Sequence, residues 1–340
     1  MNYLMLSVGR RGELLKDFRK SIPLGSRLIA TDMSPYAPAL YFADRQYIVP
    51  RIDAPDYLDQ IFDICRREEI RAVMTLIDPE IELLAKNRSR FEALGVEVLA
   101  PYEETAKLCF DKYLMYQHLK KHHIPTVETW GDFDSFQAAL AAGQVHFPVF
   151  VKPRNGSGSV GARKIDTCVL LEQAMQADPS LIIQEYMDCI DLDADVYIDT
   201  LTHEAVSAFS KRKIETKIGG ASKTISFKDD ALFQFIRDIC KVLHFNGPVD
   251  MDFFCRDGQY YLSEVNPRFG GAYLHAYGAG VDFVKLIEKN LNGAANEPCF
   301  GKYEDGVVMM MYDSVVIRRR IPGQQDEDPL VEIFTSSDES

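Results

Sequence analysis

Short apolar runs alternate with amphipathic segments over the first hundred residues of the chain. Strand-like runs cover residues 3–8, 27–31, 46–49, 72–77 and 96–100, and helical spacing covers residues 13–20, 56–69 and the segment after Asp78. Strands that alternate with helices in this way predict an α/β domain with a doubly wound parallel sheet.

Four charged residues follow the predicted strands of this sheet: Arg10, Arg11, Asp32 and Asp78. Ligands of doubly wound sheets bind beyond the carboxyl ends of the strands. A ligand role and a turn or capping role are equally open for these four residues. In the capping interpretation, Asp78 is the N-cap of a helix and Pro79 is its first helical residue.

Residues 101–125 predict a helical connector, in which Asp111 caps a helix that starts with Lys112. A lysine is unfavourable in the first turn, where the helix dipole is positive. A bound anion would explain its presence there, and a solvated surface lysine is the alternative.

From Val127 onward the pattern changes to paired strands separated by longer helices. We expect helices at 134–142, 170–177 and 231–243, and strands at 181–186, 195–201, 204–211 and 306–317. Residues 214–224 resemble a polar loop, and the acidic tail beyond Pro322 is expected to be disordered. This order predicts an α+β region with antiparallel sheets.

Composition and charge indicate the class of protein and the partners that it is not expected to bind. The 340 residues are 46% hydrophobic with a net charge of −13, which is typical of a globular protein and argues against nucleic-acid and membrane partners. No apolar run approaches the roughly 20 residues of a membrane helix, and the N-terminus lacks a secretory signal. Seven scattered cysteines without a C-x-x-C motif indicate reduced thiols and a cytoplasmic location.

A glycine- and serine-rich loop follows a short apolar strand in F-P-V-F-V-K-P-R-N-G-S-G-S-V-G, residues 147–161. Its backbone N–H groups are unobstructed and suit a phosphate, and Lys152 adds a positive charge at the strand end. The loop is neither a Walker A motif nor a Rossmann fingerprint. A flexible hairpin tip is the alternative.

A second stretch, residues 249–271, predicts a hairpin with carboxylates on one face. Alternation along a strand places Asp250 with Asp252, and Glu264 with Asn266. A three-residue loop at 256–258 would bring the two sets onto the same face, whereas a two-residue loop would separate them. We predict the three-residue loop and a site for Mg²⁺ or Mn²⁺, with a salt-bridged sheet edge as the alternative.

Together, V-K-P…G-S-G-S-V-G and E-V-N-P-R-F-G-G resemble the ATP-grasp superfamily, especially members similar to the large subunit of carbamoyl phosphate synthase. The resemblance covers roughly residues 1–318. It implies a doubly wound pre-ATP-grasp domain followed by a two-lobed ATP-grasp domain. The expected boundaries are 1–105 for the first domain, 106–126 for a helical connector, 127–189 for a lid subdomain, 190–320 for a metal-binding subdomain and 321–340 for the tail.

The resemblance also implies roles for matching residues. Lys112 and Lys152 would bind ATP phosphates under a lid of Ser157, Gly158 and Ser159. The run Gln184, Glu185, Tyr186 and Met187 would be a hinge that reads the adenine edge. Asp195 would hold the ribose, with Asp193 as a competitor. Mg²⁺ would be held by Asp252, Glu264 and Asn266. Arg268 would stabilise the transferred phosphoryl group, and Lys211, Arg212 or Lys213 would contact the acceptor.

The activity implied by the resemblance is ATP-dependent ligation, in which a carboxylate becomes an acyl phosphate and an amine or similar nucleophile attacks it. A small-molecule kinase on the same scaffold and a nucleotide-binding regulatory protein are the alternatives. The sequence does not identify the carboxylate and amine substrates. It also leaves open whether the protein is a homodimer.

Overall fold

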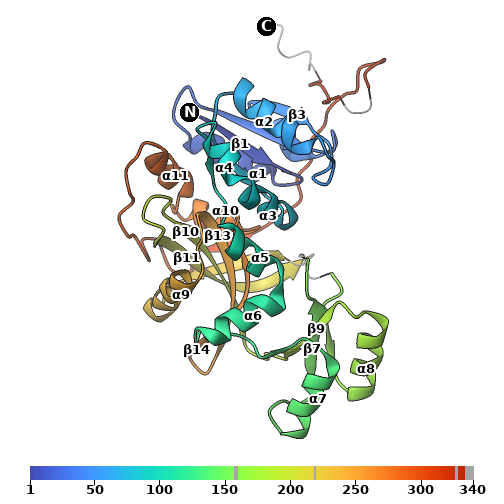
Figure 1. The fold of residues 1–340 in the computed structure, drawn as a ribbon. Helices are drawn as coiled ribbons and strands as arrows, with labels where there is room; N and C mark the ends of the chain where they lie inside the picture. Colours follow the sequence, from blue (N-terminus) through green and yellow to red (C-terminus); the bar gives the residue numbers. More distant parts are fainter. Residues whose placement is uncertain (157–159, 218–219, 326–327, 334–340) are drawn as a thin grey trace.

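The computed structural model describes residues 1–156, 160–217, 220–325 and 328–333 (Figure 1). The N-terminal region contains a five-stranded parallel sheet in the order β3-β2-β1-β4-β5. Its strands are β1 (Asn2–Leu6), β2 (Arg27–Asp32), β3 (Arg45–Ile48), β4 (Ile70–Thr75) and β5 (Glu97–Val98). These agree with the five strands expected from the sequence.

Helices cover both faces of this sheet, as a doubly wound fold requires. They are α1 (Gly12–Ser21), the 3₁₀ helix η1 (Pro38–Phe42), α2 (Tyr57–Arg67), α3 (Asp78–Lys86) and α4 (Arg88–Glu92). Leu14, Leu15 and Phe18 of α1 belong to one hydrophobic core, whereas Ile61 and Phe62 of α2 belong to another.

The connector consists of two helices, α5 (Glu103–Phe110) and α6 (Lys112–Lys121). Asp111 separates them, and its side chain accepts hydrogen bonds from the backbone N–H groups of Tyr113 and Leu114. The predicted N-cap is therefore confirmed. Lys112 begins α6, as expected.

A small lobe follows, with a four-stranded antiparallel sheet in the order β6-β9-β7-β8. Its elements are β6 (Thr129–Trp130), α7 (Phe133–Ala141), β7 (Val149–Pro153), β8 (Arg163–Ile165), α8 (Cys168–Ala177) and β9 (Leu181–Glu185). The lobe has its own hydrophobic core around Phe136, Val149 and Leu171. A separate core lets the lobe move as a unit.

The largest sheet has six strands in the order β14-β13-β10-β11-β12-β15, all antiparallel to their neighbours. The strands are β10 (Ile190–Ile198), β11 (Ala205–Lys217), β12 (Gly220–Phe227), β13 (Gly247–Arg256), β14 (Gln259–Asn266) and β15 (Val308–Met310). The remaining helices are α9 (Asp230–Val242), α10 (Tyr273–Gly278) and α11 (Phe283–Leu291).

Three predictions for this region were wrong. Residues 214–217 and 220–224 continue strands β11 and β12 instead of forming a polar loop. Strand β10 begins at Ile190, five residues before the expected start, and β15 is shorter than the expected strand at 306–317. Polar side chains on one face obscured the strand pattern, because that face carries charged pairs rather than core residues.

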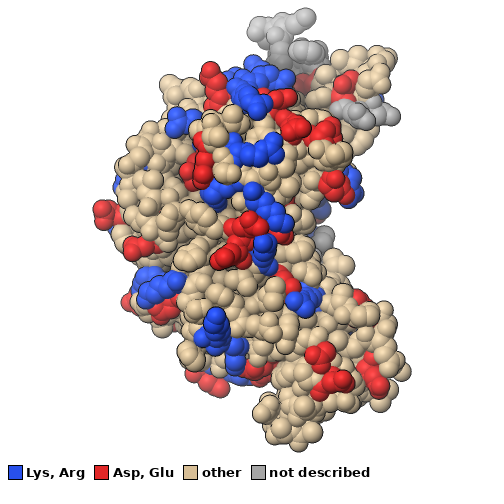
Figure 2. All heavy atoms as spheres, in the orientation of Figure 1, with Lys and Arg blue, Asp and Glu red and all other residues tan. Residues whose placement is uncertain are grey.

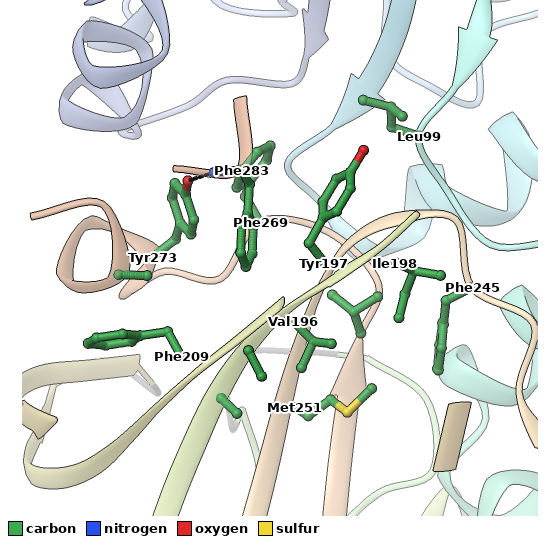
Figure 3. Packing of buried hydrophobic residues seen from close by; sticks show 14 of the residues in the cluster. Leu99, Val196, Tyr197, Ile198, Phe209, Phe245, Met251, Phe269, Tyr273 and Phe283 are labelled. Atoms are coloured by element: carbon green, nitrogen blue, oxygen red, sulfur yellow. Dashed lines mark hydrogen bonds between the residues drawn. The ribbon is translucent and has the colours of Figure 1, made fainter. Parts of the chain in front are cut away.

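Aromatic packing joins the N-terminal domain to the six-stranded sheet. Phe269 lies against Phe18 of α1, with 6.3 Å between the ring centroids. Phe269 also lies 4.7 Å from the Tyr273 ring, and Phe283 packs beside Tyr273 (Figure 3). One continuous core therefore spans these two regions, unlike the small lobe with its separate core.

The visible surface carries mixed charge. Basic and acidic side chains are interspersed over the face shown in Figure 2. The chain as a whole has a net charge of −13. Among the described residues, no helix is both long and apolar enough to cross a membrane.

Candidate active site

The β13–β14 hairpin brings the predicted metal ligands onto one face, but by a different route from the one expected. Arg256 pairs with Gln259, so the turn has two residues, Asp257 and Gly258, and the predicted three-residue loop was wrong. Both turn residues have positive φ (52° and 80°), as a type I′ turn requires. The register then shifts beyond Asp252.

This register shift is a β-bulge on β14. Phe253 pairs with Leu262 but Asp252 pairs with Glu264, which leaves Ser263 as the extra residue. Without the bulge, Ser263 would oppose Asp252 and the carboxylates would face opposite sides of the sheet. With it, Asp252 lies opposite Glu264, and Asp250 lies opposite Asn266.

Lysines surround the outer carboxylates of this face. Lys112 Nζ and Lys152 Nζ lie 3.9 and 4.0 Å from Glu264 carboxylate oxygens. Lys213 forms ion pairs with Asp252 and, at 2.9 Å, with Asp191 of β10. Burial raises the pKa of Asp252 to about 6, with the Lys213 charge opposing the rise. Burial lowers the pKa of Lys152, while Glu264 opposes that shift.

The outer carboxylates fit a hard divalent cation. Asp252 and Glu264 are about one quarter exposed (25% and 27% of their side chains), so a ligand can reach them from solvent. Asn266 adds an amide oxygen on the same face. Two carboxylates and an amide are oxygen donors of the kind that Mg²⁺ prefers.

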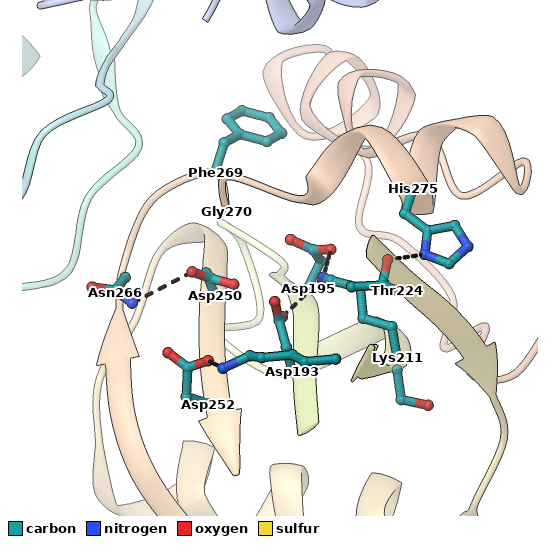
Figure 4. A network of polar contacts seen from close by, with 12 residues as sticks. Asp193, Asp195, Lys211, Thr224, Asp250, Asp252, Asn266, Phe269, Gly270 and His275 are labelled. Carbon is teal, nitrogen blue, oxygen red and sulfur yellow. Dashed lines mark hydrogen bonds and ion pairs between the residues drawn. The ribbon is translucent and has the colours of Figure 1, made fainter. Parts of the chain in front are cut away.

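A second, buried charge cluster lies deeper on the same sheet face (Figure 4). The ammonium group of Lys211 pairs with Asp193 at 2.8 Å and with Asp195, and none of its side chain is exposed. Oxygens of Asp193, Asp195 and Asp250 lie within 4.8 Å of one another, a spacing that could hold a metal ion. Lys211 already supplies a positive charge beside two of these carboxylates.

The turn after β14 covers this buried cluster. A Cβ at Gly270 would lie 2.6 Å from Oδ1 of both Asp195 and Asp250, so only glycine fits against these carboxylates. Arg11 of the N-terminal domain donates hydrogen bonds to the carbonyl oxygens of Phe269 and Gly270. The loop after β1 therefore holds the turn in place from across the domain boundary.

Arg268 lies between the two domains. Its guanidinium contacts Asp78 at 2.7 Å and Asp250 at 3.8 Å. The capping interpretation of Asp78 was wrong, because the N-cap of α3 is Ile77 and no side chain caps that helix. Asp78 instead holds Arg268 beside the carboxylates, a contact that joins residues 190 positions apart.

The predicted hinge borders a pocket beside β14. Gln184 is buried and lines this pocket together with Lys112, Met115, Leu262 and Glu264. Glu185 forms an ion pair with Arg256, and Lys164 lies 4.8 Å from the Tyr186 ring centre. Met187 is buried. The predicted hinge thus lies at the junction of the small lobe and the six-stranded sheet, beside Lys112 and Glu264.

Arg212 and Asp195 lie in positions that do not suit the roles expected for them. Arg212 is exposed, and alternation along β11 turns it away from the face that carries Lys211 and Lys213. Asp195 is 1% exposed and paired with Lys211, so its carboxylate cannot reach a ribose at the hinge. Neither position supports the expected role, and both assignments stay predictions. The expected lid residues Ser157, Gly158 and Ser159 lie outside the described residues.

Sequence reasoning missed Asp191 and gave Arg11 no specific partner. Asp191 lies at the hinge end of β10, pairs with Lys213 and keeps 41% of its side chain exposed. The alternation of Asp191, Asp193 and Asp195 along one strand could have revealed it. No local signal could have connected Arg11 with Gly270.

Comparisons with known proteins agree with this architecture. Residues 3–99 match the model of a PylC-like N-terminal domain, and residues 109–272 match the model of an ATP-grasp domain. The arginine-specific large chain of carbamoyl phosphate synthase from Geobacillus stearothermophilus is 23% identical over 306 residues. That match covers 85% of this chain but only 28% of the relative.

Two solved structures share the fold. N5-carboxyaminoimidazole synthetase from Staphylococcus aureus in complex with ADP has a TM-score of 0.72 at 17% identity, over 91% of this chain and 81% of that one. The biotin carboxylase domain dimer of the Hydrogenobacter thermophilus 2-oxoglutarate carboxylase, with MgADP, ADP and bicarbonate, has a TM-score of 0.70 at 16% identity, over 90% and 73%. The chain therefore contains an ATP-grasp domain at residues 109–272, which follows a PylC-like N-terminal domain at residues 3–99.

Proposed function

We propose that this protein is an ATP-dependent ligase that converts a carboxylate into an acyl phosphate and couples it to an amine, with release of ADP and phosphate. One observation carries the proposal. Asp252, Glu264 and Asn266 share one sheet face, and Lys112 of α6 and Lys152 of β7 lie 3.9 and 4.0 Å from the Glu264 carboxylate. Such a set of oxygen ligands beside two cations suits the triphosphate of ATP.

Asp252, Glu264 and Asn266 would hold Mg²⁺, and Mn²⁺ would suit the same ligands. When bound, the metal neutralises negative charge on the phosphate oxygens during transfer. Lys112 and Lys152, which now lie near Glu264, would turn to the phosphates of ATP. Glu264 would then contact the cation and the nucleotide in place of the two lysines.

Arg268 would position the acceptor carboxylate and stabilise charge on the transferred group. Its contact with Asp78 fixes the guanidinium plane, so less freedom is lost when it binds an anion. Lys213, which pairs with Asp252, would contact the acceptor. Asp191 is our candidate for the ribose hydroxyls, because it is exposed at the hinge end of β10.

The small lobe would close over ATP as a unit. It has its own core, whereas the N-terminal domain and the six-stranded sheet share one. Closure would exclude water, which hydrolyses acyl phosphates. The substrates would be small molecules that bind between the N-terminal domain and β14, and a cytoplasmic location goes with this proposal because ATP is the co-substrate.

The test is ADP release from ATP and Mg²⁺, measured with pooled carboxylates in the presence and absence of pooled amines. A ligase requires both pools, and its activity is lost in Glu264→Gln and on removal of the metal by a chelator. Arg212→Ala is the matched control, since this exposed residue lies on the opposite face. A stable phosphorylated product formed with one pool alone would identify a kinase and overturn the ligase assignment.

A further inference from the structure

Three of the seven histidines in this chain lie together at the end of α6, at positions 118, 122 and 123. His118 is in the last turn of the helix, and His122 is its C-cap residue. Residues four positions apart lie on the same face of a helix. The two rings accordingly pack together, with 4.6 Å between their centroids and 43° between their planes. Neither ring has a part in the candidate active site, which lies beside Lys112 at the other end of α6.

The hydrogen bond of His118 determines which of its ring nitrogens is free. Nε2 lies 2.8 Å from the carbonyl oxygen of Val242. A carbonyl oxygen can only accept, so Nε2 carries the proton, and Nδ1 of the neutral ring keeps its lone pair. Histidines that bind metals almost always donate their other ring N–H to a carbonyl, a carboxylate or water, which fixes the tautomer and orients the ring. His118 therefore already makes the outer hydrogen bond of a metal ligand.

His122 offers a second nitrogen donor that solvent can reach. The residue is exposed, and no described residue forms a hydrogen bond with its ring. Desolvation and, after it, the neighbouring His118, Lys121 and His123 lower the pKa of His122 from its ordinary 6.5. Its ring is therefore predominantly neutral at pH 7, and a histidine must be neutral to bind a metal.

The charges around the pair are compatible with a bound cation. The C-terminal end of a helix carries a partial negative charge, which favours a cation within the last turn. Lys120 in the same turn forms an ion pair with Glu128, so its charge is compensated. Lys121 is exposed, and solvent and salt screen its charge.

We propose that His118 and His122 form a binding site for a divalent transition-metal ion such as Zn²⁺. Nδ1 of His118 and a ring nitrogen of His122 are the protein ligands, and water fills the remaining positions. Two histidines four positions apart on a helix are the arrangement with which H-E-x-x-H motifs bind Zn²⁺. The bound ion would stabilise the folded chain, because unfolding separates the two ligands.

Ligand chemistry distinguishes this site from the proposed magnesium site. Imidazole nitrogen suits Zn²⁺, Cu²⁺ and Ni²⁺, whereas Mg²⁺ prefers oxygen ligands such as those around Glu264. An excess of Mg²⁺ should therefore compete for the carboxylates and leave the histidine pair free for Zn²⁺. The two sites also lie at opposite ends of α6, so an ion at the histidines leaves the candidate active site open.

Calorimetric titration of the reduced full-length chain with Zn²⁺, in excess Mg²⁺, tests this proposal. The wild type should bind Zn²⁺, and its melting temperature should rise when Zn²⁺ is added. His122→Ala should weaken binding by more than about 10–100-fold, which is the usual cost of losing only an outer partner of a ligand. Without metal this variant should melt like the wild type, because the residue is exposed. His146→Ala is the matched control, since His146 is an exposed histidine of the small lobe, and it should bind Zn²⁺ like the wild type.

Three results would overturn the proposal. The wild type could fail to bind Zn²⁺, His122→Ala could bind it with unchanged affinity, or His146→Ala could lose it. Unchanged affinity in His122→Ala would place the ion at the cysteines or the carboxylates instead. Glu264→Gln separates this proposal from the ligase activity, because it should abolish ADP release and keep Zn²⁺ binding. Loss of Zn²⁺ binding in Glu264→Gln would place the ion at the candidate active site and exclude the histidine pair.

Discussion

Two sets of charged side chains on the same sheet face differ in their access to solvent. In the outer set, Lys213, Asp252 and Glu264 keep 13%, 25% and 27% of their side chains exposed. In the inner set, Lys211 and Asp195 keep 0% and 1%. Outer charges can exchange a lysine for a ligand, whereas inner charges depend on their charged neighbours because solvent does not reach them. The inner residues therefore serve architecture, and we propose that similar residues in the outer set bind a ligand.

The largest effect should come from Lys211→Met. This change leaves Asp193 and Asp195 buried without their cation, and breaking a buried pair costs about 3–5 kcal/mol. We expect the free energy of unfolding to fall by that amount in urea denaturation. Lys213→Met is the matched control two residues along the same strand, and it should lose activity with a much smaller loss of stability. Equal stability losses in the two variants would remove the distinction between the sets.

Asp252→Asn should separate activity from stability in the outer set. It removes one ligand charge from the metal site, while Lys213 keeps its pair with Asp191. We expect kcat to fall about 10²–10³-fold, the size typical of a lost electrostatic contact in an active site. Its melting temperature should stay close to that of the wild type. A collapse in stability would assign Asp252 to the architectural set instead.

Gly270→Ala tests how closely the turn covers the inner set. The added methyl group would meet Asp195 and Asp250 oxygens at 2.6 Å, and overpacking of this kind costs about 1–3 kcal/mol. Thermal unfolding measures the loss. Gly271→Ala is the control, because a Cβ there meets nothing within 4 Å. Similar melting temperatures for both variants would mean that the turn can move away from the carboxylates.

Stability should also depend on pH at the rim of the inner set. His275 accepts or donates a hydrogen bond at Nδ1 with Thr224 (2.7 Å). Burial and, to a lesser extent, the Lys211 charge lower the pKa of His275 to about 4 from an ordinary 6.5. Between these values the unfolded chain binds more protons than the folded one, so stability falls as pH decreases from 6.5 toward 4.

This histidine contributes a loss of about 2 kcal/mol between pH 7.5 and pH 5. The measurement is the difference in unfolding free energy between these pH values for the wild type and for His275→Asn. The variant should lose less stability on acidification. An identical loss in both proteins would show that His275 does not titrate differently on folding.

Local patterns in the sequence determined much of this molecule. Alternating strand and helix patterns identified the N-terminal sheet, and Asp111 was recognised as a helix cap from its neighbours. The hairpin that carries Asp252 and Glu264 was also evident, because strand alternation and a Gly258 turn are local features. These predictions succeeded because they depend on residues within a few positions of one another.

Tertiary structure decided what depends on distant partners. The bulge at Ser263 set the register of the proposed metal ligands, and contacts across domains assigned Asp78 to Arg268 and Arg11 to Gly270. Lys211 and Lys213 have the same chemistry and share a strand face, so no sequence pattern separates them. Lys211 pairs with Asp195, against which the turn at Gly270 lies, whereas Lys213 pairs with the partly exposed Asp191. Burial is a property of the folded chain, and it determines what each charge can do.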